Sequence, residues 1–109
     1  TQDAGFAACE PGRPACEVFR VVEAEFERQG LPFRMPHIGH GLGIGLHEFP
    51  MLEPKNTTPL EAGMVLNVEP MAVFPDRNEC YHTEDLIVVG ADESKLLTKP
   101  QDSLIRIAG

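Results

Sequence analysis

The segment GHGLGIGLHEFP, Gly39 to Pro50, combines alternating glycines with two histidines. Each glycine inside a helix costs about 1 kcal/mol relative to alanine, so the segment is not expected to be helical. As a regular strand it would place the glycines on one face, where another backbone or a ligand can approach closely. The other face would carry His40, Leu42, Ile44 and Leu46. His47 would then face away from His40, so bringing both imidazoles to one site requires a bend between Leu42 and Leu46, which glycine permits.

One helix is expected before this segment, over residues 13–29. Its apolar residues recur at i, i+3, i+4, i+7 and i+11, as one helical face requires. They are Ala15, Val18, Phe19, Val22 and Phe26. Pro14 suits the first helical position and Gly30 the end of the helix. Residues 1–10 are typical of the last turns of an earlier helix that ends before Pro11.

Prolines divide the rest of the chain into short pieces with strand-like sequences. The clearest candidates are residues 64–69 and 84–89, and residues 72–74 continue the first of them. Two shorter candidates cover residues 94–98 and 103–107. A helix followed by several strands, with few helices between the strands, predicts an α+β fold with an antiparallel sheet and a flanking helix.

Composition limits the partners and the compartment. The net charge of -8 comes without a cluster of lysine and arginine, so we expect no nucleic-acid partner and no anionic membrane partner. Neither a transmembrane run nor a signal-peptide pattern is recognised. Cys9, Cys16 and Cys80 form no CxxC pair, which favours reduced thiols in a cytoplasmic protein.

Two glutamates stand at the ends of apolar strands, Glu69 in NVEP and Glu84 in HTEDLIVV. A carboxylate beside a buried strand is costly unless it is paired or bound to a cation. Together with His40, these side chains form an oxygen and imidazole set suited to divalent Mn, Co, Zn or Fe. The alternatives are exposed carboxylates at strand ends and histidines with structural hydrogen bonds. The GxGxxG and HExxH patterns are both absent.

Three motifs in this order, GHGLGIGLHEFP, EAGMVLNVEPM and HTEDLIVV, resemble the C-terminal half of the catalytic domain of the pita-bread metallopeptidases. This family includes Xaa-Pro dipeptidase, aminopeptidase P and methionine aminopeptidase. The resemblance implies that residues 1–109 are a partial catalytic domain, without the N-terminal half that carries two aspartate ligands. It also implies a peptidase that hydrolyses N-terminal or Xaa-Pro bonds of a peptide substrate with metal-activated water, and that is inactive as this fragment.

The resemblance assigns a role to five residues. His40, Glu69 and Glu84 match metal ligands, in a complete enzyme that holds two divalent ions. Manganese or cobalt is the first expectation, and zinc or iron is the alternative. Glu69 also matches the group that moves the proton of the attacking water. His47 matches a catalytic histidine that contacts substrate, and His37 a further histidine on the substrate side.

Two other functions remain open from the sequence. One is a metal-free hydrolase of the creatinase type, which would replace the ligands with non-ligating residues. The other is a catalytically dead homologue that serves as a binding module. Whatever the function, the strands missing from this half of the fold would leave one sheet edge and much apolar surface uncovered, which favours loose packing or self-association into a homo-oligomer.

Overall fold

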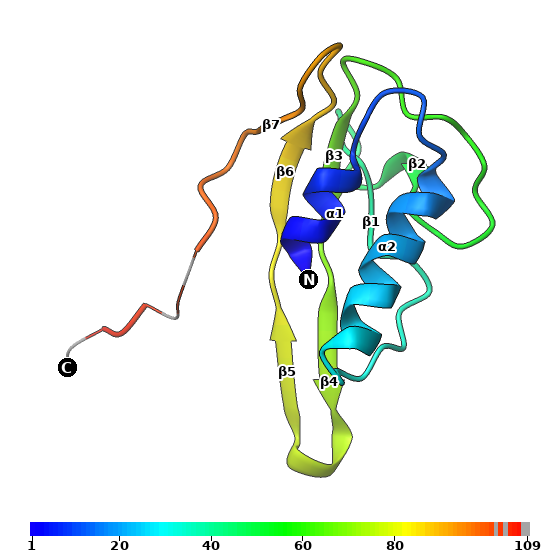
Figure 1. Ribbon diagram of the computed structural model, residues 1–109. Helices are drawn as coiled ribbons and strands as arrows, with labels where there is room; N and C mark the ends of the chain where they lie inside the picture. The colour runs from blue at the N-terminus through cyan, green and yellow to red at the C-terminus, as the bar shows by residue number, and fades with distance from the viewer. Residues whose placement is uncertain (102, 104, 108–109) are drawn as a thin grey trace.

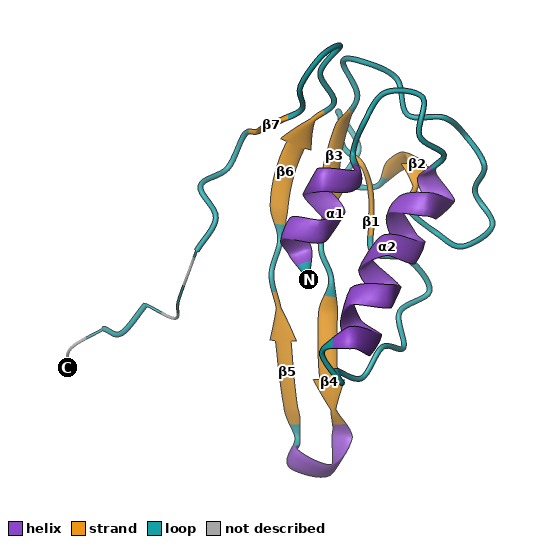
Figure 2. Cartoon of the chain, in the orientation of Figure 1, coloured by secondary structure: helices purple, strands orange, loops and turns teal. Residues whose placement is uncertain are grey.

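Two helices cover one face of an antiparallel sheet (Figure 1). The computed structural model describes residues 1–101, 103 and 105–107. Figure 2 shows the elements of these residues by type. They are α1 (Gln2–Ala8), α2 (Ala15–Arg28), β1 (Gly39–Gly41), β2 (Glu48–Met51), β3 (Val65–Val68), β4 (Met71–Phe74), the short 3-10 helix η1 (Pro75–Arg77), β5 (Glu79–His82), β6 (Asp85–Val88) and β7 (Lys95–Leu96). The predicted α+β class with an antiparallel sheet and a flanking helix is confirmed.

The helix α2 packs on the sheet through the apolar stripe that the sequence predicted. All five residues of that stripe are buried, and the helix lies within the predicted range, with Pro14 as its N-cap. The earlier helix is also confirmed as α1. A Cβ atom on Gly5 of α1 would come within 3.0 Å of methyl groups of both Val22 and Val68. The absence of a side chain there lets α1 approach α2 and β3 closely.

Five strands form the main sheet, in the order β2-β1-β3-β6-β7, and β4 pairs with β5 separately. The β3–β6 and β4–β5 pairs are two parts of one long hairpin, as Figure 1 shows. Val68 pairs with Asp85 before the interruption and Met71 pairs with His82 after it, so the register is unchanged across the gap. The interruption therefore places Glu69 opposite Glu84.

Several strand predictions need correction. The segment after Gly39 is not one regular strand: β1 ends at Gly41, residues 42–47 form an irregular loop, and Ile44 is fully exposed. The bend required between Leu42 and Leu46 is confirmed. The loop forms because glycine favours neither regular element and Ile44 finds no apolar neighbour to pack against.

Three further strand predictions, over residues 72–74, 94–98 and 103–107, also differ from the structure. Residues 72–74 belong to β4, which continues the line of β3 after an interruption at Glu69 and Pro70 and pairs with the unpredicted β5 as a separate two-stranded sheet. The strand predicted over 94–98 is reduced to the two residues of β7. Of the strand predicted over 103–107, residue 104 lies outside the described residues, and 103 and 105–107 carry no strand. Within the described part of the chain, no helix has the length and hydropathy needed to cross a membrane.

Candidate metal centre

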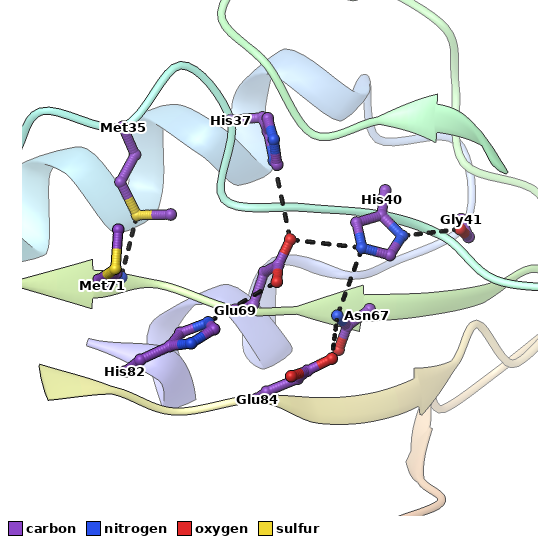
Figure 3. Close-up of polar contacts among 9 residues, drawn as sticks. All are labelled: Met35, His37, His40, Gly41, Asn67, Glu69, Met71, His82 and Glu84. Atoms are coloured by element: carbon purple, nitrogen blue, oxygen red, sulfur yellow. Dashed lines mark hydrogen bonds and ion pairs between the residues drawn. The ribbon is translucent and has the colours of Figure 1, made fainter. Parts of the chain in front are cut away.

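His40 lies in the middle of β1 and is 2% exposed. Its Nδ1 is 2.9 Å from the carbonyl oxygen of Gly41, which can only accept a hydrogen bond, so Nδ1 carries the proton. The other ring nitrogen, Nε2, therefore presents its lone pair towards Glu69 and Asn67 (Figure 3). A histidine that donates one N–H to a backbone carbonyl is oriented as metal-binding histidines are.

Glu69 follows β3 at the point where the strand ladder is interrupted. Its Oε1 lies 3.3 Å from Nε2 of His40 and 3.8 Å from Nδ1 of His37, and its Oε2 lies 3.7 Å from Nε2 of His82 (Figure 3). The backbone N–H of Glu69 donates to the carbonyl of Ile38 at 2.8 Å, which holds the carboxylate beside the segment that carries two of these histidines. One carboxylate is thus surrounded by three imidazoles.

Glu84 joins this cluster through Asn67. The buried side chain of Asn67 donates from Nδ2 to Oε1 of Glu84 at 2.9 Å, and the same nitrogen lies 3.5 Å from Nε2 of His40. The shared register places Glu84 opposite Glu69, and two like charges at opposed positions are unfavourable. The structure therefore brings the three predicted metal ligands, His40, Glu69 and Glu84, to one face of the sheet.

His47 reaches the same cluster from the end of the loop 42–47. Its ring centroid lies 4.2 Å from that of His40, although His47 itself is exposed. The loop is closed by Glu48, whose Oε1 accepts the backbone N–H of Gly45 at 2.6 Å and whose carboxylate packs where a side chain on Gly43 would lie. The predicted substrate role of His47 stays a prediction, but its position beside His40 agrees with the bend that the role requires.

Two further histidines border the cluster. His37 is partly buried, with a ring centroid 6.4 Å from that of His40. His82, at the end of β5, was missed by the sequence analysis, as was Asn67. A signal for both was present, because His82 precedes Glu84 by two residues and Asn67 precedes Glu69 by two. In a strand this spacing places both members of each pair on one face.

The donor atoms of the cluster fit divalent cations. Two groups of three side chains each bring one ligand atom per residue to within 4.8 Å of the others. The first group is His40, His47 and Glu69, and the second is Glu69, His82 and Glu84. Imidazole nitrogen and carboxylate oxygen together suit Mn, Fe, Co and Zn. Glu69 belongs to both sets.

The cysteines are not part of this cluster. Cys9 and Cys16 are buried and Cys80 is exposed, and all three are free. Burial raises the pKa of the Cys9 thiol to about 12, against a smaller opposing effect of Arg13, and the Sγ atom of Cys9 donates to the carbonyl of Gly5 at 3.2 Å. A thiol with so high a pKa is a poor metal ligand, because the thiolate is the form that binds.

Comparison with known proteins relates this chain to a peptidase family. The model of metallopeptidase family M24 matches residues 1–91. The Xaa-Pro dipeptidase of Pyrococcus furiosus is 29% identical over 90% of this chain, which spans 28% of that relative.

Among solved structures, the dipeptidase PepE of Mycobacterium ulcerans matches with a TM-score of 0.87 and 30% identity. The match covers 95% of this chain and 28% of the PepE chain. The prolidase of Pyrococcus horikoshii matches with a TM-score of 0.86 and 30% identity, over 95% and 30% of the two chains. The chain thus spans less than a third of the length of these relatives and has part of their pita-bread fold, as the sequence predicted. With the family model matched over most of its length, the chain belongs to metallopeptidase family M24.

Proposed function

We propose that this chain is part of the catalytic domain of a peptidase that uses two divalent cations to hydrolyse Xaa-Pro or N-terminal peptide bonds. The observation that carries this proposal is the convergence of His40, Glu69 and Glu84 on one face of the sheet, linked by Asn67. The names of the Xaa-Pro dipeptidase and the prolidase among the relatives support proline-directed cleavage.

Each residue of the cluster has a role that follows from its position. His40, Glu69 and Glu84 hold the cations, which when bound supply Lewis acidity and acidify water at neutral pH. Glu69 takes the proton of the attacking water and delivers it to the amine nitrogen that leaves. His47, exposed beside His40, donates a hydrogen bond to the oxygen that becomes negative during attack on the carbonyl. His37, on the partly buried side of Glu69, contacts the substrate.

We further propose that residues 1–109 are inactive alone. The cluster offers a limited set of anionic ligands for two dications, and the two aspartates that the family resemblance implies have no counterpart in it. The exposed apolar residues of the chain, among them Phe49, Tyr81 and Leu97, would be covered by further structure or by a second copy.

A complementation assay tests this proposal. The purified chain is assayed with Mn²⁺ or Co²⁺ on a panel of Xaa-Pro dipeptides and N-terminal methionyl peptides, first alone and then with the segment encoded upstream added as a separate chain. We expect activity only in the combined sample. Turnover by the chain alone within tenfold of the median enzyme rate, about 10 per second, would contradict the requirement for the upstream half.

The same assay separates the two alternative functions. Removal of metal with a chelator should abolish the activity of the combined sample, and added Mn²⁺ or Co²⁺ should restore it. Activity that survives the chelator would favour a metal-free hydrolase of the creatinase type. Tight peptide binding without hydrolysis in the combined, metal-loaded sample would favour a binding module.

A further inference from the structure

We propose that Met35 is a positioning residue for Glu69, because its thioether fixes the backbone on the far side of Pro70. Met35 lies in the segment between α2 and β1 and packs against the hydrophobic core. Its Sδ atom accepts a hydrogen bond from the backbone N–H of Met71 at 2.9 Å (Figure 3). This inference rests on the proposed function, in which Glu69 moves a proton, and it adds a residue that acts through Glu69.

Glu69 lies where the backbone can donate few hydrogen bonds. Glu69 and Pro70 interrupt the ladder between the strand pairs β3–β6 and β4–β5. Pro70 has no N–H to donate. The N–H of Glu69 donates to the carbonyl of Ile38 at 2.8 Å, and the next N–H along the chain is that of Met71. The N–H groups of Glu69 and Met71 are therefore the donors that can hold this interruption against the segment before β1.

A side chain supplies the second acceptor because the neighbouring backbone does not continue as a strand. Gly39 pairs with Val68 in the β1–β3 register, and the same register carried three residues further would set Pro36 opposite Met71. The chain bends at Pro36 instead. The side chain of Met35 is unbranched and flexible, so it can reach across the space that the bend leaves. Its sulfur then serves as the acceptor, although a thioether accepts hydrogen bonds only weakly.

Residues 35–38 thus hold the backbone on both sides of the Glu69 carboxylate. The N–H of Glu69 bonds to Ile38, and the N–H two residues later bonds to Met35. The same segment carries His37, whose Nδ1 lies 3.8 Å from Oε1 of Glu69. Loss of the thioether would free the backbone after Glu69 and displace the carboxylate. A displacement of about 1 Å can cost about 10²-fold in rate, so a weak bond can matter more for turnover than for stability.

Matched methionine substitutions test the inference. Met35→Leu keeps an apolar side chain and removes the acceptor, and Met35→Gln restores an acceptor oxygen. Met64→Leu is the control, because Met64 also packs against the core and its Sδ also accepts a backbone N–H, that of Glu61 at 3.3 Å. Met64 lies at the opposite end of β3 from Glu69.

Each variant is labelled with ¹⁵N and combined with the unlabelled upstream segment of the complementation assay. Amide hydrogen exchange, the midpoint of thermal unfolding, kcat and KM are measured on the same samples. Exchange at the Met71 amide reports the hydrogen bond itself, and the comparison of kcat with KM reports the position of Glu69.

In Met35→Leu the Met71 amide should exchange about 2- to 10-fold faster than in the wild type, as expected for the loss of one hydrogen bond. Its kcat should fall by about 10- to 100-fold at unchanged KM, the pattern of a contact that matters only in the transition state. Met35→Gln should recover part of both losses. Met64→Leu should match Met35→Leu in unfolding midpoint and the wild type in kcat.

Unchanged exchange of the Met71 amide in Met35→Leu would overturn the inference at its first step. A kcat of Met35→Leu equal to that of Met64→Leu, or a fall that Met35→Gln does not reverse, would overturn the positioning role and leave the proposed function intact. A combined wild-type sample without activity would overturn the proposed function and the positioning role with it.

Discussion

On the face of the main sheet that the helices cover, Leu66, Val68 and Ile87 are at most 3% exposed. On the other face, alternate positions of the same strands and their continuations carry Asn67, Glu69 and Glu84. Cross-strand partners share a face, so each face is consistent across β1, β3 and β6.

The difference shows how one pair of strands serves two purposes. The covered face removes apolar surface from water, which supplies most of the favourable free energy of folding. The opposite face carries the acidic and imidazole side chains of the proposed metal centre, which bury little apolar surface. We therefore expect substitutions on the covered face to change stability but not activity, and substitutions on the open face to change activity but not stability. The following predictions test that separation.

The largest effect is expected for Glu69→Gln, measured in the complementation assay described above. Loss of the proton transfer proposed for Glu69 should lower kcat by about 10²- to 10⁴-fold. In the absence of metal the midpoint of thermal unfolding should not fall, because the change removes one of two opposed negative charges. Glu61→Gln, at an exposed glutamate in a turn, is the control and should retain full activity. A fall in the unfolding midpoint would contradict the separation of the two faces.

On the covered face, Leu66→Ala should destabilise the chain by about 2–5 kcal/mol, because Leu66 is completely buried and its truncation leaves a cavity. Leu46→Ala is the matched control at a position that is 73% exposed, and it should change stability by less than about 0.5 kcal/mol. Urea denaturation measures both. Equal losses in the two variants would mean that Leu46 packs against structure in solution.

A smaller effect is expected for Gly39→Ala, which should influence both faces. A Cβ atom at this position would collide with the carbonyl oxygen of Asn67, so β1 and β3 would have to separate. We expect a loss of about 1–3 kcal/mol, as for other overpacked sites, measured by urea denaturation. Cobalt affinity should fall as well, because His40 and Asn67 pair across these two strands. Unchanged stability would show that this contact relaxes without cost.

The smallest effect is expected on the solvent side of α2. Hydrogen bonds from Arg28 first, and from Gln29, lower the pKa of Glu25 from 4.5 to about 2. A lowered pKa in the folded state means that the contribution of Glu25 is complete above pH 4.5 and is lost as the pH falls towards 2. The stability difference between wild type and Glu25→Gln should be small, because the pair is exposed, and should vanish across this interval. A difference that persists at pH 2 would contradict this assignment.

Part of this molecule could be predicted from local patterns alone. The apolar stripe of α2 and the alternation in β3 and β6 follow from side-chain periods of about 3.6 and two residues, which need no knowledge of distant contacts. The order of the glycine-histidine, NVEP and HTED motifs pointed to the family. Gly39, Gly41 and Gly43 also indicated that a regular helix could not form there.

The cluster itself depended on tertiary structure. Nothing local to β5 indicates that it pairs with β4 in the register that continues β3 and β6, yet this register sets Glu69 opposite Glu84 and brings His82 beside them. The loop that returns His47 to His40 and the placement of Asn67 between His40 and Glu84 likewise depend on contacts between distant segments. The sequence by itself determined which side chains were available and how they alternate along each strand. Only strand pairing decided which of them meet, because a shift of one residue in register would have turned the same side chains to the opposite face.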